Sequence, residues 1–110
     1  MISFDQITFV ITTFKSEKVI FNCLSELPRV SPKIIIENSG NNILKKDLEN
    51  KFQNLECLVM NQNIGYGKAN NIGISKSKTN YIFIINPDTL FLKKNLNLFL
   101  SKIEKENFSI

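Results

Sequence analysis

Short runs rich in β-branched and aromatic residues alternate along this chain with segments whose apolar residues recur at helical spacing. The runs predict strands and the spaced segments predict helices. A strand-helix order repeated in this way is typical of a parallel sheet with helices on both faces. Right-handed crossovers then favour the strand order 3-2-1-4. The predicted strands are 7–12, 33–37, 55–60 and 81–85, and the predicted helices are 17–27, 44–52, 68–77 and 92–103.

The sequence thus indicates one α/β domain, Rossmann-like, that occupies residues 1–110. Ser16 is placed to cap the first helix, since serine is a favoured N-cap residue. Cys23 falls on an apolar helix face and Cys57 within a strand, so both are expected to be buried, reduced thiols. The chain has no histidine and no CxxC pair, which excludes histidine-dependent catalysis and mixed Cys/His zinc sites.

The formal net charge of +4 suits a phosphate-bearing ligand or an anionic membrane surface. The lysines are scattered and aromatic residues are not interleaved with them, so compositional bias is the stronger interpretation and nucleic acid is not the expected partner. The amino terminus lacks a basic leader, and no apolar run approaches the roughly 20 residues of a spanning helix. We therefore expect a cytoplasmic protein, with peripheral membrane attachment as the alternative.

Polar residues gather where the predicted strands end. They are Thr12, Thr13, residues 37–39, Asn61 and residues 86–88, and the opposite strand ends carry no such cluster. Ligands of open parallel sheets bind beyond the carboxyl ends of the strands, at the point where the strand order reverses. The asymmetry predicts a ligand site there, between strands 7–12 and 81–85.

The segment 63–71 places two glycines around an aromatic residue just before a helix. Gly65 and Gly67 permit positive φ and close backbone approach, and the helix start with Lys68 can receive phosphate. The segment matches neither GxGxxG nor the P-loop, so a dinucleotide site and a P-loop NTPase are both unsupported.

Two acids have competing interpretations. Asp88 is either a turn residue after Pro87 or a carboxylate for a divalent cation that meets a diphosphate. Glu37 is either a solvated charge at a strand end or an acceptor for a ligand N–H or hydroxyl. Asn38 and Ser39 are turn formers first and ligand contacts second.

Four motifs in order resemble family 2 glycosyltransferases, particularly the rhamnosyltransferase-like branch. They are FVITTFK at 9–15, ENSG at 37–40, NIGYG at 63–67 with Asn71 in the following helix, and NPDT at 86–89. The resemblance spans nearly the whole chain, and the ordered set is more specific than any single motif. It implies a partial GT-A fold that forms the nucleotide-sugar-binding half of such an enzyme.

The resemblance also implies roles for the matching residues. Thr12 and Phe14 would border the nucleotide base, and Glu37 would hydrogen-bond it. The rest of the implied donor site comprises Ser39, Gly65, Lys68, Asn71, Asn86 and Asp88. Asp88 would hold Mg²⁺ or Mn²⁺ against the diphosphate of a UDP- or dTDP-linked sugar. Glu37 stands where the family has Asp, and Asn86 stands where many members have an acid.

By the same resemblance, the acceptor site and general base belong to a second half that would follow the motif at 86–89. The implied function is sugar transfer to an acceptor in glycan or cell-surface polysaccharide synthesis, with the isolated 110 residues inactive in transfer. Two alternatives remain open, a non-catalytic nucleotide-binding module of the same fold and an unrelated Rossmann-like domain. The uncharged edge strand 81–85 predicts self-association through that strand.

Overall fold

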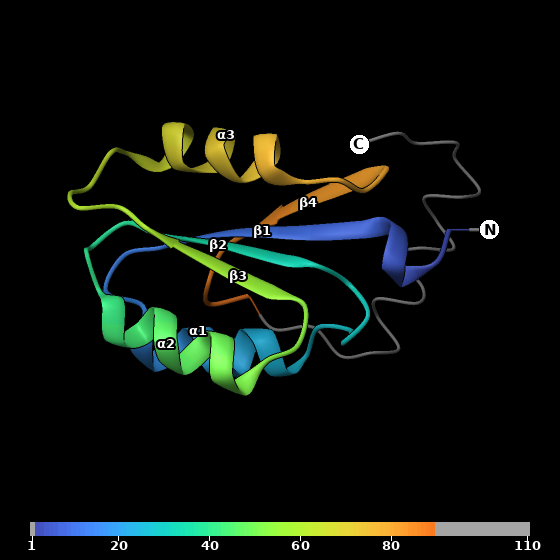
Figure 1. The fold of residues 1–110 in the computed structure, drawn as a ribbon, viewed down its shortest axis with the longest axis horizontal. Helices are drawn as coiled ribbons and strands as arrows, with labels where there is room; N and C mark the ends of the chain where they lie inside the picture. The colour runs from blue at the N-terminus through green and yellow to red at the C-terminus, as the bar shows by residue number, and fades with distance from the viewer. Residues whose placement is uncertain (1, 90–110) are drawn as a thin grey trace.

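The computed structural model describes residues 2–89, and the predicted helix 92–103 lies outside them. The four strands form one parallel sheet in the order β3-β2-β1-β4, which confirms the predicted fold class and strand order. Helices α1 and α2 cover one face and α3 covers the other (Figure 1). The elements are a 3-10 turn at Phe4–Gln6, β1 Ile7–Thr13, α1 Glu17–Ser25, β2 Lys33–Glu37, α2 Asn42–Lys51, β3 Leu55–Val59, α3 Tyr66–Lys76 and β4 Tyr81–Ile85.

The two central strands are buried along their whole length, whereas β3 and β4 are only partly buried. Residues Ile11 and Thr13 of β1 lie opposite Ile35 and Glu37 of β2. The carboxyl ends of β1 and β2 are therefore level, and the loops that follow them start side by side.

Successive strand residues face opposite sides of the sheet, so the core has two layers. The larger layer packs β1 residues against α1 and α2, and includes an edge-to-face pair of Phe9 and Phe83 with ring centroids 5.7 Å apart. The smaller layer lies under α3 and is built on Ile34, Ile36 and Ala69.

Helix α3 approaches the sheet closely at Gly73. A Cβ atom at that position would lie 2.4 Å from Cγ1 of Val10, inside any normal contact distance. Gly73 is therefore a spacing residue, since it has no side chain to separate α3 from β1.

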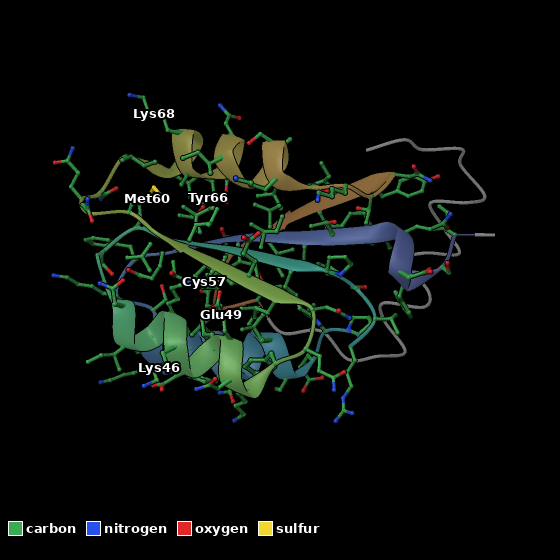
Figure 2. The ribbon with its side chains drawn as sticks, viewed as in Figure 1. Lys46, Glu49, Cys57, Met60, Tyr66 and Lys68 are labelled. Carbon is green, nitrogen blue, oxygen red and sulfur yellow. The ribbon has the colours of Figure 1, made fainter. Side chains whose placement is uncertain are left out.

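The edge strand β3 is capped by two side chains from α2. Glu49 Oε2 accepts the Cys57 N–H at 2.9 Å, and Lys45 Nζ donates to the Cys57 carbonyl at 2.5 Å. The same two side chains form a salt bridge of 2.8 Å. Figure 2 shows Glu49 next to Cys57. The pair occupies backbone groups that an edge strand otherwise offers to another chain.

Some local expectations are corrected. Ser16 precedes α1 but makes no capping bond with its side chain; its hydroxyl instead accepts the Phe14 N–H and donates to the Phe14 carbonyl. Helix α2 starts at Asn42, earlier than predicted, because the Asn41 side chain caps it by accepting the Leu44 N–H at 2.9 Å. Helix α3 starts at Tyr66 instead of residue 68.

Cys23 and Cys57 are buried free thiols, as expected. Within residues 2–89, no helix combines the length and apolarity needed to cross a membrane.

Candidate functional site

A cavity of about 260 Å³ opens where β1 and β2 end. This is the side of the sheet where the sequence predicts a ligand site. Larger hollows of about 400 and 300 Å³ both include Lys33, at the opposite strand ends, away from the polar cluster. The residues that line the 260 Å³ cavity are Thr12, Phe14, Ser16, Asn38, Asn63, Tyr66 and Pro87.

One wall comes from the end of β1. The Thr12 hydroxyl donates to Asn70 Oδ1 of α3 at 2.8 Å, and both groups are buried. This bond ties α3 to β1 beside the cavity. Phe14 follows the strand and is 48% exposed, so its ring is available to an aromatic or apolar ligand group.

The opposite wall is the loop before α3, which Asn38 holds in place. The Asn38 side chain donates to Asn63 Oδ1 at 2.9 Å and accepts the Ile64 N–H at 3.0 Å. Asn63 in turn accepts the Gly65 N–H at 2.8 Å. Gly65 adopts φ 90 and ψ 156, a combination that is essentially restricted to glycine. The glycine requirement predicted for the loop is therefore confirmed at Gly65.

The third side of the cavity is the turn after β4. Asn86 Oδ1 accepts the Tyr66 hydroxyl at 3.2 Å, and the Asn86 carbonyl accepts the Thr89 N–H at 3.0 Å. Asp88 is exposed on this turn, directly after Pro87. The Cys23 thiol of α1 donates to the Asn86 carbonyl at 3.9 Å, so this turn lies against α1. Burial, assisted by the charge of Asp88, raises the pKa of Cys23 to about 11.

Glu37 does not line the cavity. Its side chain is fully buried, which overturns the interpretation as a solvated strand-end charge. One carboxylate oxygen accepts from the Thr13 hydroxyl, and the other accepts the N–H groups of Ser39 and Asn41. The Ser39 hydroxyl lies 2.9 Å from both oxygens. No Glu37 oxygen is exposed in this arrangement, so none is available for the direct hydrogen bond to a nucleotide base that the resemblance implies.

The other predicted residues divide into three groups. Thr12 and Phe14 line the cavity, while Gly65, Ser39 and Asn86 lie in the loops behind it. Lys68 and Asn71 are exposed on α3 and do not line the cavity. Figure 2 shows Lys68 on the side of α3 away from the sheet.

Asn38, which the sequence offers as a secondary ligand contact, lines the cavity, and so does Tyr66, inside the segment 65–68 that the resemblance implies lies near the donor. Ser16, Asn63 and Pro87 line it without having been predicted as contacts, and the last two belong to the quoted motifs at 63–67 and 86–89. The α3 asparagine that hydrogen-bonds a residue of the cavity wall is Asn70, which accepts from Thr12, whereas Asn71 is exposed.

The profile of the glycosyl transferase family 2 matches residues 8–110, nearly the whole chain. The chain belongs to glycosyltransferase family 2. Members of this family generally use a divalent metal.

A low-salt glycan biosynthesis hexosyltransferase, Agl10 of Haloferax volcanii, is 24% identical over an alignment of length 110. The alignment covers 96% of this chain and 35% of that protein. The crystal structure of S. aureus TarS 1-349 superposes with a TM-score of 0.74 at 18% identity, over 90% of this chain and 32% of TarS. The TarS complex with UDP-GlcNAc gives the same TM-score and identity, over 90% and 31%. These structures share the GT-A type α/β fold, and the chain spans about a third of the length of these relatives.

The residues near the cavity fit a divalent metal only in part. Among residues 2–89, no cluster of three or more His, Cys, Asp or Glu side chains is arranged to hold a metal. Asp88 is an exposed carboxylate, and Mg²⁺ is commonly held by one or two carboxylates together with substrate phosphates. The donor set therefore suits a metal that arrives with a diphosphate.

Proposed function

We propose that this chain is the donor-binding part of a glycosyltransferase, a single domain over residues 1–110 that binds a UDP- or dTDP-linked sugar for transfer in glycan synthesis. The observation that carries the proposal is the 260 Å³ cavity, because the loops of all four family motifs meet around it or directly behind it. The binding of UDP-GlcNAc by TarS, a relative in fold, supports the same class of ligand.

The cavity offers the nucleotide one aromatic wall and one polar wall. Phe14, with its half-exposed ring, is suited to pack on the base, since aromatic side chains stack on the faces of nucleobases. Tyr66 is 51% exposed across the cavity, and its hydroxyl is oriented by Asn86. Asn38 and Asn63 supply the amide groups of the polar wall.

The diphosphate would lie toward the turn 86–89 and the start of α3. Backbone N–H groups at the start of α3 have no side-chain cap, and the first turn of a helix favours anions. Asp88, with the side-chain oxygen of Asn86, would hold Mg²⁺ or Mn²⁺ there. When bound, such a metal neutralises charge that develops on the departing nucleoside diphosphate.

In this proposal the chain binds and orients the donor and does not activate the acceptor. No carboxylate among the described residues lines the cavity, so no group there is placed to remove a proton from an acceptor. The acceptor site and the general base would belong to the part of the family fold outside the roughly one third of the relatives' length that this chain spans.

The proposal is tested by calorimetry with UDP, dTDP and ADP, each with and without Mg²⁺ or Mn²⁺. The wild-type chain should prefer the pyrimidine diphosphates, and metal should strengthen binding. Asp88→Ala should lower the affinity measured with metal about tenfold, or roughly 1.4 kcal/mol, because it removes the carboxylate ligand.

Asp47→Ala is the matched control, since Asp47 is an exposed acid on α2 that does not line the cavity. It should bind as the wild type does. Equal affinity of Asp88→Ala and wild type in the presence of metal would refute the metal role. Equal binding of ADP and UDP would refute the pyrimidine donor.

A further inference from the structure

Glu37 links three parts of the backbone near the cavity, two of them directly and the third through Ser39. It accepts from Thr13 at the end of β1, at 3.0 Å, and from Ser39 N and Asn41 N in the loop before α2, at 2.8 and 2.9 Å. The Ser39 hydroxyl also donates to Glu37 and accepts the Lys15 N–H at 3.3 Å. The third segment is thus the loop between β1 and α1.

Lys15 is the residue in that loop whose conformation is unfavourable. Its φ is 53, in the left-handed region, which a residue with a Cβ adopts only where the surroundings hold it. The Ser39 hydroxyl is the acceptor that fixes the Lys15 N–H. Ser39 thereby links the strained residue to the buried carboxylate.

The neighbours of Lys15 on both sides line the cavity. Phe14 precedes it and Ser16 follows it, and the Ser16 hydroxyl bonds to both the N–H and the carbonyl of Phe14, at 3.0 and 3.2 Å. A left-handed residue between them turns the chain so that both side chains reach the cavity. Release of Lys15 to an ordinary conformation would redirect Phe14.

We propose that Glu37 is a positioning residue that acts through Ser39 and the left-handed Lys15 to hold Phe14 and Ser16 in the wall of the donor cavity. The proposal rests on the proposed function, because the expected benefit is nucleotide affinity. Glu37 itself does not touch the nucleotide. A preformed wall binds more tightly because the ligand does not have to order the loop.

The test compares Ser39→Ala with Ser39→Thr in the 110-residue chain. Two readouts are measured on each variant: UDP affinity with Mg²⁺ by calorimetry, and the Lys15 amide by NMR, through its coupling to the α proton and its hydrogen exchange. Ser39→Ala should lower UDP affinity about tenfold, or roughly 1.4 kcal/mol, and change the Lys15 coupling and exchange. Ser39→Thr keeps the hydroxyl, so its UDP affinity and its Lys15 amide should stay close to those of wild type.

Ser31→Ala is the matched control for lost stability. Ser31 is a fully buried serine whose hydroxyl donates to the Phe4 carbonyl at 2.6 Å. It precedes β2, at the opposite end of that strand from the partly buried Ser39. It should destabilise the fold without changing UDP affinity or the Lys15 amide. Glu37→Gln should reproduce the effects of Ser39→Ala if the variant still folds.

The outcomes separate this proposal from the proposed function. If wild type does not bind UDP, the proposed function and the effect of Ser39 on nucleotide affinity are both refuted. The coupling and exchange of the Lys15 amide then still show whether Ser39 positions the loop. An unchanged Lys15 amide in Ser39→Ala overturns the positioning role whatever the affinity. A changed amide with unchanged UDP affinity overturns the role in binding.

Discussion

Lys33 is a buried lysine without a carboxylate partner among the described residues. Its side chain is 3% exposed at the start of β2, and its Nζ donates to the Arg29 and Gln53 carbonyls at 3.3 and 3.2 Å. Burial lowers the pKa of Lys33 to about 8, because two carbonyl dipoles replace only part of its hydration. We predict that the contribution of this one side chain to the free energy of unfolding rises from neutral to alkaline pH.

The magnitude follows from the two pKa values. A difference between an ordinary value of 10.5 and about 8 corresponds to roughly 3 kcal/mol at 1.36 kcal/mol for each pH unit. The unfolded chain binds the proton more tightly, so unfolding takes up a proton between pH 8 and 10.5. The stability that Lys33 contributes therefore rises with pH across that window and is lost again as pH falls toward 8.

The assay is urea unfolding of wild type and Lys33→Met at several pH values from 7 to 10.5. The difference between the two proteins is needed, because burial also raises the pKa of Cys23 to about 11 and that of Cys57 to about 12. Above about pH 9 these thiols ionise in the unfolded chain but stay protonated in the folded one, so they lower stability as pH rises. They are common to both proteins and cancel in the difference.

Between pH 7.5 and 10.5, the free energy of unfolding of wild type should rise by about 1–3 kcal/mol relative to that of Lys33→Met. Lys33→Met also loses two hydrogen bonds. This loss shifts the difference in unfolding free energy between the two proteins at every pH and leaves its slope against pH unchanged. Lys78→Met is the control, since Lys78 is an exposed lysine near the same strand ends. A flat difference for Lys33→Met, equal to that of the control, would refute a buried ammonium at this position.

Three further predictions concern packing, transfer and association. Gly73→Ala should lower the free energy of unfolding by about 1–3 kcal/mol, because its Cβ would collide with Val10; the loss should shrink in a Val10→Ala background, measured by urea unfolding, and an equal loss in both backgrounds would contradict the collision. The 110-residue chain should give no glycosylated product from UDP- or dTDP-sugars in mass spectrometry, and steady turnover would disprove this. The chain should self-associate at micromolar concentration in sedimentation, with Ile84→Lys reducing association because Ile84 is 44% exposed on β4; a strictly monomeric wild type would end that expectation.

The fold follows from the sequence because its signals are local and strong. Three of the four strands are compact runs of β-branched or aromatic residues, β3 is a short and mostly apolar run, and parallel connections leave few possible strand orders. The position of the cavity follows for a similar reason, since polar residues gather at the carboxyl ends of β1 and β2 and in the turn after β4. A general rule of parallel sheets therefore located the cavity without any knowledge of its shape.

The roles of single residues were harder to predict, because they depend on how loops and helices pack. Helix α3 buries Ala69, Asn70 and Gly73 against the sheet. Small and polar residues mark this face, so hydrophobic spacing gives no signal that distinguishes Asn70 from Asn71. Glu37 presents the same difficulty, since its burial depends on N–H groups that only the folded turn supplies.

The motif at the end of β2 gains a physical meaning from the structure. Neighbouring residues at the end of a strand face opposite sides of the sheet. Glu37 serves the loops on the side of α1 and α2, through Thr13, Ser39 and Asn41. Asn38 serves the other side, where it holds the loop before α3. The cavity lies between the two sets of loops, so in our proposal two adjacent side chains, at the end of β2 and just after it, hold its two walls.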